Sequence, residues 1–433
     1  MKSPFRSTSD TSAGRVRLIE SLTPFYVSRP AAICRNQRRS VFFPAGDRED
    51  PTIRAARQSL SKSLDTIVRP DMNKLIYWLL MLVPATLGVH YAFPAAHTLV
   101  FGLSAMAMIP LAHLLSESTE NAAARVGQTL GALLNVTFGN VGEIVIGFFA
   151  LRAGLQNVVK ASITGSILVN LLLTLGISMT AGGMRNKTLT FNALGARTQA
   201  TMLALAAISL IFPAAYHMFA GPTALRSEAD LSLEFSLVLL LTYGLSLVFS
   251  LRTHRKLLTG GRNEQIDTHE VWPLQRSLSL LVVSAIFVGW MGEVLVDSVE
   301  VAAQSLGLTD LFVGLVIVAI AGNAAESTSA IRAALKGRMD LCVGVAIGSS
   351  LQIALFVGPL LVLLSYWFGK RPMDLVFTPA ELVALVLAIA ITVQIAGDGE
   401  SNWFEGVQLL AVYLMLAVMI YYLPGETREA QAR

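Results

Sequence analysis

The sequence is poor in charged residues, cysteine and histidine, and each shortage excludes a class of protein. Only 14% of the 433 residues are charged, against about 25% in soluble domains, which excludes an ordinary water-covered globule. Cys34 and Cys342 are its two cysteines and neither belongs to a CxxC pair, so we expect neither a disulfide framework nor a thiolate metal site. The six histidines show no HExxH spacing, and we expect no resident cofactor.

Apolar residues are abundant instead. They make up 54% of the sequence, and runs of about 18 or more recur from residue 73 onward, long enough to cross a bilayer as helices. We therefore predict an all-α, polytopic membrane protein with about eleven transmembrane helices. The predicted limits of these spans are 74–92, 97–116, 129–151, 158–181, 198–217, 232–251, 276–299, 309–334, 340–367, 375–396 and 405–423.

The spans divide the chain into two five-helix halves preceded by one extra helix. The predicted parts are a basic, disordered N-terminal tail (1–71), the extra first transmembrane helix (72–96), the first five-helix repeat (97–251), a cytoplasmic linker (252–275), the second five-helix repeat (276–424) and a C-terminal tail (425–433). The Arg- and Ser-rich residues 1–71 also fit a transit peptide, or an extension upstream of a start at Met72. Acidic residues such as Asp47 and Glu49 argue against a transit peptide.

Lys and Arg are unevenly distributed between alternate predicted loops. With the N-terminus in the cytoplasm, the inner loops hold 12 of them and the outer loops 5, which is the bias that the positive-inside rule expects. An odd number of spans then places the C-terminus outside. We favour a bacterial inner membrane, and an organellar membrane is also compatible. We expect the protein to be embedded in a lipid bilayer and not to bind nucleic acid. Its oligomeric state stays open.

A short motif occurs twice at matching intervals. Gly139-Asn140-Val141-Gly142-Glu143 lies in the third predicted span and Gly322-Asn323-Ala324-Ala325-Glu326 in the eighth. A Gly-Ser pair follows 26 residues after the first glycine of each copy, at Gly165-Ser166 and Gly348-Ser349. Since five spans separate the copies, they are predicted to cross the bilayer in opposite directions, as in the inverted repeats of many secondary transporters.

Glycines within the motif weaken the helix where a transporter needs it to break. Breaks at Gly139, Gly142 and Gly322 would leave backbone carbonyls and amides free to face an ion near the midplane. Small residues also let helices pack closely, and this alternative stays open for each single glycine.

Glu143 and Glu326 lie inside otherwise apolar spans. A charge at that depth costs about 2.5–3.5 kcal/mol on insertion scales, so each glutamate needs a cation, a proton or a paired side chain. No Lys or Arg lies at comparable depth in either span, which disfavours a structural salt bridge. Two carboxylates from opposing helices balance the charge of one divalent cation. We therefore predict that these two glutamates are metal ligands and also the shared binding site for protons.

Calcium fits such a site better than magnesium, because magnesium gives up its water reluctantly and seldom uses an all-protein cage. Calcium accepts roughly six to eight oxygen ligands, so neutral groups must complete the site. The predicted neutral donors are Asn140, Asn323, Ser166, Ser349, Asn170 and Gln352. Once the ion leaves, two neighbouring carboxylates cannot both stay ionised in a low dielectric, and protons replace it. The predicted activity is exchange of Ca²⁺ for H⁺ by alternating access, with Ca²⁺ as substrate.

Further acidic residues lie near the predicted span ends. Glu117 and Glu120 follow the second span, and Asp297 and Glu300 lie at the end of the seventh. By the predicted symmetry these pairs would form vestibules that concentrate cations at opposite membrane faces, although solvated helix ends explain them equally well. Glu381, within the tenth predicted span, lies either near the pathway or at a wet span end.

The paired motifs resemble the calcium/proton exchanger family of the cation/calcium exchanger superfamily. GNVGEIVIGFFALRAG followed by GSILVNLLLTLG is similar to its first signature repeat, and GNAAESTSAIRAALKGRMDLCVGVAIGSSLQIALFVGP to its second; the likeness covers residues 72–424. It implies an eleven-span antiporter with one span outside two inverted halves, and the two motif glutamates as calcium and proton sites. It also implies that Asn170, Gln352, Ser166 and Ser349 face that site.

The chain departs from the family pattern in three places. Ser327 follows the second motif glutamate where the family commonly has His, a residue assigned a part in proton handling or ion choice. The first motif reads GNVGE where GNATE or GNAVE is usual, and the loop 252–275 is mainly basic where the family often carries an acidic run. These departures bear on selectivity and coupling.

Other activities fit the sequence less well. Sodium-coupled cation exchange, or Na⁺/H⁺ exchange on the same scaffold, is the nearest alternative, but sodium-coupled relatives generally place more acids where this chain has Asn170 and Gln352. An intramembrane protease would need paired aspartates or a Ser/His dyad; His113 and His217 lie near predicted span ends without a GxSG partner. A receptor or structural bundle has no use for paired buried glutamates. We therefore expect a transporter and not an enzyme.

Overall fold

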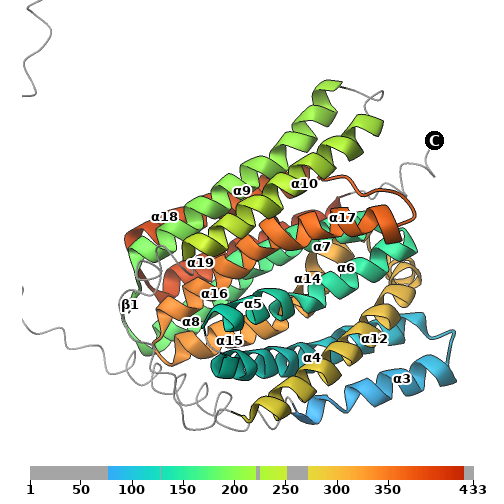
Figure 1. The fold of residues 1–433 in the computed structure, drawn as a ribbon, viewed down its shortest axis with the longest axis horizontal. Coiled ribbons are helices and arrows are strands. Elements are labelled where there is room, and N and C mark those ends of the chain that lie inside the picture. Colours follow the sequence, from blue (N-terminus) through green and yellow to red (C-terminus); the bar gives the residue numbers. More distant parts are fainter. Residues whose placement is uncertain (1–76, 127, 221–224, 251–271, 424–433) are drawn as a thin grey trace, which may run out of the picture. The chain divides into compact units, whose positions relative to one another are not determined.

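The computed structural model describes residues 77–126, 128–220, 225–250 and 272–423, and these are almost entirely helical (Figure 1). The predicted tails 1–71 and 425–433 and most of the predicted linker lie outside the described residues. The elements up to residue 250 are α3 (Leu82–Ala92), α4 (His97–Val126), α5 (Gln128–Gly139), α6 (Val141–Ala153), α7 (Gln156–Leu168), the π-helix η1 (Val169–Thr174), α8 (Leu175–Arg185), β1 (Leu189–Thr190), α9 (Ala193–Ala220) and α10 (Leu225–Val248). The later elements are α12 (Leu274–Leu306), α13 (Asp310–Phe312), η5 (Val313–Val318), α14 (Ala319–Gly322), α15 (Ala324–Leu335), α16 (Met339–Gln352), η6 (Ile353–Val357), α17 (Gly358–Phe368), α18 (Pro379–Asp398), β2 (Glu400–Ser401) and α19 (Trp403–Tyr422).

Long apolar helices confirm the predicted fold class, an all-α polytopic membrane protein. Within the described ranges, eight helical segments are long and apolar enough to cross a membrane: His97–Val126, Gln156–Arg185, Ala193–Ala220, Glu228–Val248, Leu274–Leu306, Met339–Phe368, Pro379–Asp398 and Trp403–Tyr422. A ninth is formed if Asp310–Gly322 and Ala324–Leu335, bent by 57°, count as one span. The number eleven stays a prediction, because Tyr77–Ala92 is shorter and α5 and α6 are separate helices.

The outer helices expose large apolar side chains. On α9, Leu205 is 60% exposed and Phe212 54%, and on α10 Leu241 and Leu245 are exposed to a similar extent. In water, apolar surface on this scale would drive association, but in a bilayer it contacts acyl chains. The exposure therefore has the pattern that a lipid environment requires.

The centre of the helical bundle is the continuous segment formed by α7, η1 and α8. In its most apolar stretch 83% of the residues are buried, compared with 22% in α10. In a π-helical turn such as η1 each backbone hydrogen bond spans one residue more than in an α-helix, and such turns often mark a functional site. Here the turn places the polar residues Asn170 and Thr174 in the interior, where both are fully buried.

Helices α4 and α12 lie against one another in opposite directions (Figure 1). The hydroxyls of Thr98 and Ser305 are 2.7 Å apart at one end of the pair, and Asn121 accepts a hydrogen bond from the Trp272 amide, 3.0 Å, at the other. Both helices are longer than predicted: α4 continues past residue 116 to Val126, and α12 past residue 299 to Leu306.

Polar residues near the predicted limit of the second span do not end the helix there. The hydroxyls of Ser118 and Thr119 donate to the carbonyls of Leu114 and Leu115, four residues earlier in the helix, at 2.6 and 2.8 Å. Both side chains are fully buried, so the polar stretch continues the helix. His113, expected near a span end, accordingly lies within α4.

The same order of elements follows each copy of the motif. Helices α6 and α15 are followed by Gly154 and Gly337, whose φ angles of 90° and 71° are in the left-handed region that glycine adopts freely. Next come α7 with η1 in the first half and α16 with η6 in the second. The motif thus recurs with its local structure, and the opposite direction of the two copies in the membrane stays a prediction.

Candidate cation site

Each motif asparagine interrupts a helix and places the following glutamate in a first turn. Asn140 (φ −106°, ψ 19°) separates α5 from α6, and Asn323 (φ −92°, ψ 12°) separates α14 from α15. Glu143 and Glu326 therefore lie at the start of α6 and α15, where unpaired amides and the helix dipole favour negative charge. Both copies of the motif thus hold a carboxylate at the amino end of a half-helix.

The two breaks lie close together. A Cβ atom placed on Gly142 would be 3.7 Å from the carbonyl oxygen of Gly322, and one placed on Gly322 would be 3.6 Å from Oε1 of Glu143. The two motifs, which are 183 residues apart in the sequence, thus bring their carboxylates into one region.

The glutamate oxygens are buried without protein partners. Both carboxylate oxygens of Glu143 and Oε2 of Glu326 are inaccessible to solvent and accept no hydrogen bond from the described residues. A buried carboxylate without a partner is strongly unfavourable, because neither water nor a donor replaces its lost hydration. A cation or a proton at these oxygens would remove that cost.

The predicted amide donors form hydrogen bonds between the two halves. Asn140 Nδ2 donates to Gln352 Oε1 at 2.6 Å. Asn170 Nδ2 donates to Asn323 Oδ1 at 2.9 Å, and Asn323 Nδ2 donates to Ser166 Oγ at 2.7 Å. The structure thus brings five of the six predicted neutral donors into contact across the repeat boundary.

One amide oxygen in this network is left over. Asn170 Oδ1 is buried and has no partner among the described residues, whereas Asn323 Oδ1 already accepts a hydrogen bond. Ser349, the sixth predicted donor, is half-buried on α16, three residues before Gln352. Asn170 is therefore the amide best placed to offer an oxygen to a cation.

The composition of the donor set is typical of a weakly charged site for a hard cation. Within the described residues, no three His, Cys, Asp or Glu side chains are grouped so that they could hold a metal ion. A cation at Glu143 and Glu326 would therefore need amide, hydroxyl and carbonyl oxygens as its other ligands, a mixture that calcium accepts.

The four acids predicted as vestibules lie on α4 and α12. Glu117 accepts a hydrogen bond from Tyr77 Oη at 3.0 Å and lies 3.9 Å from His113 Nε2. Glu120 is exposed, and its Oε1 accepts a hydrogen bond from Ser116 at 3.4 Å. Because α4 and α12 are antiparallel, the exposed Asp297 and Glu300 lie at the opposite end of the pair. Both pairs lie inside long helices and not at helix ends; their vestibule role stays a prediction.

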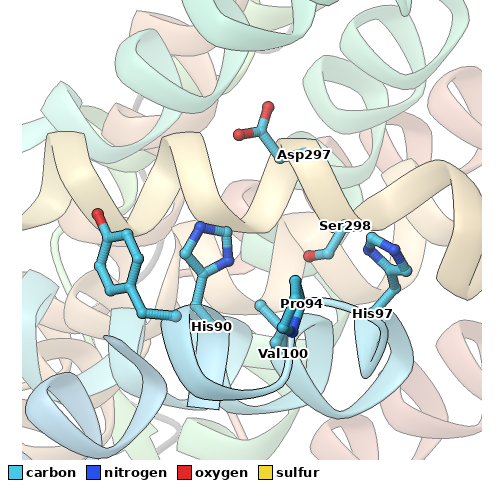
Figure 2. Close-up of a pocket in the computed structure, with 7 residues that line it drawn as sticks. His90, Pro94, His97, Val100, Asp297 and Ser298 are labelled. Carbon is cyan, nitrogen blue, oxygen red and sulfur yellow. The ribbon is translucent and has the colours of Figure 1, made fainter. Parts of the chain in front are cut away.

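Asp297 also lines a pocket of about 330 Å³ beside α3 (Figure 2). The other lining residues are His90, Tyr91, Pro94, His97, Val100 and Ser298. Figure 2 shows the Asp297 carboxylate turned away from the two imidazole rings. The pocket was not anticipated from the sequence, and it contains neither of the motif glutamates.

Glu381 has a structural role. It is 2% exposed, and its Oε2 accepts hydrogen bonds from the amide and hydroxyl of Thr378, both at 2.8 Å, which closes a capping box at the start of α18. Its Oε1 accepts from Thr164 at 2.9 Å. The wet span end considered for Glu381 was wrong, because its side chain is buried and its oxygens are already bonded; a place near the pathway stays a prediction.

Sequence reasoning missed a polar contact next to the site. Thr174 Oγ1 and Ser327 Oγ are 2.6 Å apart and join η1 to α15. Thr174 follows Asn170 by four residues and Ser327 follows Asn323 by four, so helical periodicity alone could have placed both on the faces that carry the asparagines.

Comparison with known proteins gives consistent matches over almost the whole described chain. A profile of the family described as "Sodium/calcium exchanger protein" matches residues 96–252 and 276–422. The sequence is 40% identical over 367 residues to the Ca²⁺/H⁺ antiporter of Aphanothece halophytica, covering 82% of this chain and 98% of that protein. It is 37% identical over 394 residues to the vacuolar calcium ion transporter of Schizosaccharomyces pombe, covering 88% and 95%. The solved structure of native YfkE superposes with a TM-score of 0.70 at 35% identity, over 80% of this chain and all of that one.

Proposed function

The chain belongs to the sodium/calcium exchanger protein family, and from this we propose that it is a secondary transporter that exchanges Ca²⁺ for H⁺ across a membrane. The matched relatives include proteins named Ca²⁺/H⁺ antiporter and vacuolar calcium ion transporter. Membership makes the chain a multi-pass membrane protein and a transporter. Because matched relatives are bacterial and vacuolar alike, the bacterial inner membrane stays a prediction.

Glu143 and Glu326 are the proposed site for both ions. The observation that carries this proposal is the set of buried carboxylate oxygens that have no partner in the described residues. One Ca²⁺ neutralises two carboxylates, and protons neutralise them in its absence. The site therefore carries no net charge with either ion bound. Exchange follows because the two occupants compete for the same oxygens.

Alternating access is the proposed mode of transport. Its support is that corresponding segments of the two halves pack differently. In the second half η5 and α14 pack closely on α7, whereas α5, which corresponds to them in the first half, packs mainly on α4. Two inverted repeats in different conformations would expose the site to one side of the membrane, and exchange of the two conformations would expose it to the other. The repeat with its local structure is observed; its inversion and its motion are part of the proposal.

Purified protein in proteoliposomes tests the activity. An imposed pH gradient, acidic inside, is expected to drive calcium into the vesicles with no sodium present, and collapse of the gradient with a protonophore is expected to stop it. Uptake that requires a sodium gradient would instead support the sodium-coupled alternative. Absence of calcium movement under both gradients would refute calcium exchange altogether.

A further inference from the structure

Two hydroxyl groups link the halves of the protein directly beside the proposed site. Thr174 is the last residue of η1, and Ser327 follows Glu326 in the first turns of α15. Their oxygen atoms are 2.6 Å apart, a short hydrogen bond between hydroxyls. Thr174 is fully buried, so water cannot replace the Ser327 hydroxyl as its partner.

The same two faces are joined one helical turn earlier. Asn323 accepts from Asn170 at 2.9 Å and donates to Ser166 at 2.7 Å. Asn323 and Ser327 are four residues apart, as are Asn170 and Thr174, so the attachments lie on matching helical faces. Glu326 stands between Asn323 and Ser327 in the sequence, and its half-helix is therefore held to η1 on both sides of the carboxylate.

The first half of the protein has no equivalent of the hydroxyl pair. In the register set by the two motifs, Ser327 corresponds to Ile144 and Thr174 to Val357. These side chains contain no hydrogen-bonding atom, so the turn that carries Glu143 cannot be attached to η6 in this way. The two glutamates of a repeated motif are thus supported differently.

We propose that Thr174 and Ser327 are positioning residues that hold Glu326 as the fixed carboxylate of the cation site, leaving Glu143 as the carboxylate that adjusts. The proposal rests on the proposed function of the site. A ligand fixed before binding loses less conformational freedom when the ion arrives, so loss of the hydroxyl pair weakens binding without removing any ligand.

Substitutions of the pair test this assignment by calcium binding to the purified full-length protein in detergent. Thr174→Val keeps the side-chain shape and removes the hydroxyl, and Ser327→Ala removes the other. Each is expected to weaken calcium binding about 3- to 10-fold, which is the effect of one lost hydrogen bond. The double variant is expected to lose no more affinity than the more strongly affected single variant, because both substitutions remove the same hydrogen bond. Ser327→Thr keeps the hydroxyl and is expected to keep the wild-type affinity.

A matched control separates positioning from general damage. Thr392 is also buried, and its hydroxyl donates to Ala388 O at 2.7 Å within α18. Thr392→Val is expected to bind calcium as the wild type does. Losses that add in the Thr174→Val and Ser327→Ala double variant, or an equal loss in Thr392→Val, would overturn the assignment.

Carboxyl labelling provides a readout that needs neither calcium nor transport. A hydrophobic carbodiimide reacts with buried carboxyl groups, and mass spectrometry measures the modification of Glu143 and Glu326 separately. Ser327→Ala and Thr174→Val are expected to change the labelling rate of Glu326 and not that of Glu143. If neither rate changes, or both change alike in folded protein, the positioning role is wrong. Wild-type protein that fails in the proteoliposome assay would refute the proposed exchange but would leave this result to stand.

Discussion

Glu143 and Glu326 differ from Glu381, another buried acid of the bundle, in what surrounds their oxygens. Glu381 is fully buried, but hydrogen bonds from Thr378 and Thr164 occupy both of its oxygens. Both oxygens of Glu143 and one of Glu326 have no such partner in the described part of the chain. Glu405 Oε2 is also buried without a partner in the described residues, but Glu405 lies outside the paired motifs and its Oε1 accepts a hydrogen bond from Asn402 at 2.7 Å. Because a buried charge must be compensated, the two motif glutamates are the pair that we propose to need a mobile ion.

Replacing either motif glutamate is expected to abolish exchange. Glu143→Gln and Glu326→Gln keep the volume and one oxygen, but they remove the charge and the proton site. Calcium-45 uptake into inverted vesicles, driven by a pH gradient, should fall to the level of empty vesicles in both variants, with expression and folding retained. Either variant transporting calcium at the wild-type rate would show that the site lies elsewhere.

Glu381→Gln is the control variant, because it makes the same substitution at a buried acid outside the proposed site. An amide has a single acceptor oxygen, so the hydrogen bond from Thr164 must be lost or reversed, and loss of the bond should lower stability by about 1–3 kcal/mol. The measurements are the thermal unfolding midpoint, which we expect to fall, and the apparent KM for calcium, which we expect to be unchanged. A changed KM with an unchanged midpoint would assign Glu381 to the pathway.

At the scale of elements, a small-residue surface is covered in one half and open in the other. Gly165 on α7 packs against the Leu315 backbone of η5, and a Cβ atom on Gly314 would be 2.7 Å from Val158 O. In the motif register Gly165 corresponds to Gly348 on α16. A Cβ atom placed on Gly348 would meet none of the described residues within 4 Å. The open surface is where α5 would pack if the halves exchanged conformations.

Alanine at the open surface should stabilise the helix and slow transport. Gly344 and Gly348 both have free space around an added Cβ, and alanine in place of helical glycine gains about 0.5–1 kcal/mol. If α5 must approach this surface during each cycle, Gly344→Ala and Gly348→Ala should reduce the exchange rate by about tenfold, equivalent to about 1.4 kcal/mol in the barrier.

The control is Gly244→Ala on α10, where an added Cβ also meets nothing within 4 Å. This variant should gain similar stability and exchange calcium at the wild-type rate. The thermal midpoint and the initial rate of calcium uptake, measured on all three variants, separate the two effects. Equal rates in all three variants would remove the support for packing of α5 on α16.

At the scale of the whole molecule, proton competition predicts the pH dependence of calcium transport. Lowering the pH on the calcium side adds protons to the site, so the apparent KM for calcium should rise, by up to about tenfold per pH unit for each competing proton. The maximal rate at saturating calcium on that side should change less. The check is a series of uptake measurements at fixed pH on the opposite side. A KM that is independent of pH would contradict a shared site.

The sequence predicted the parts of the fold that depend on apolar length and on internal repetition. Apolar runs identified the long helices, and the paired motif identified Asn140, Asn323 and the two glutamates. It did not predict where α4 ends, because Ser118 and Thr119 bond to their own helix and are buried by tertiary packing.

Contacts between residues far apart in the chain were beyond sequence reasoning. The Thr174–Ser327 pair spans 153 residues, and the hydrogen bond from Thr164 to Glu381 spans 217. Such pairs are set by which helical faces meet, and a single sequence records only that each face is polar. The different packing of α5 and η5 likewise belongs to one conformation of the protein, and the amino-acid sequence does not predict it.

Proton release on calcium binding tests the shared site most directly. Titration calorimetry of the purified protein, repeated in buffers of different ionisation enthalpy, counts the protons that leave when calcium binds. We predict that calcium binding releases protons in the wild type, and that Glu143→Gln and Glu326→Gln lose both the release and the binding. Calcium binding with no proton release, or release that persists unchanged in both variants, would contradict the account.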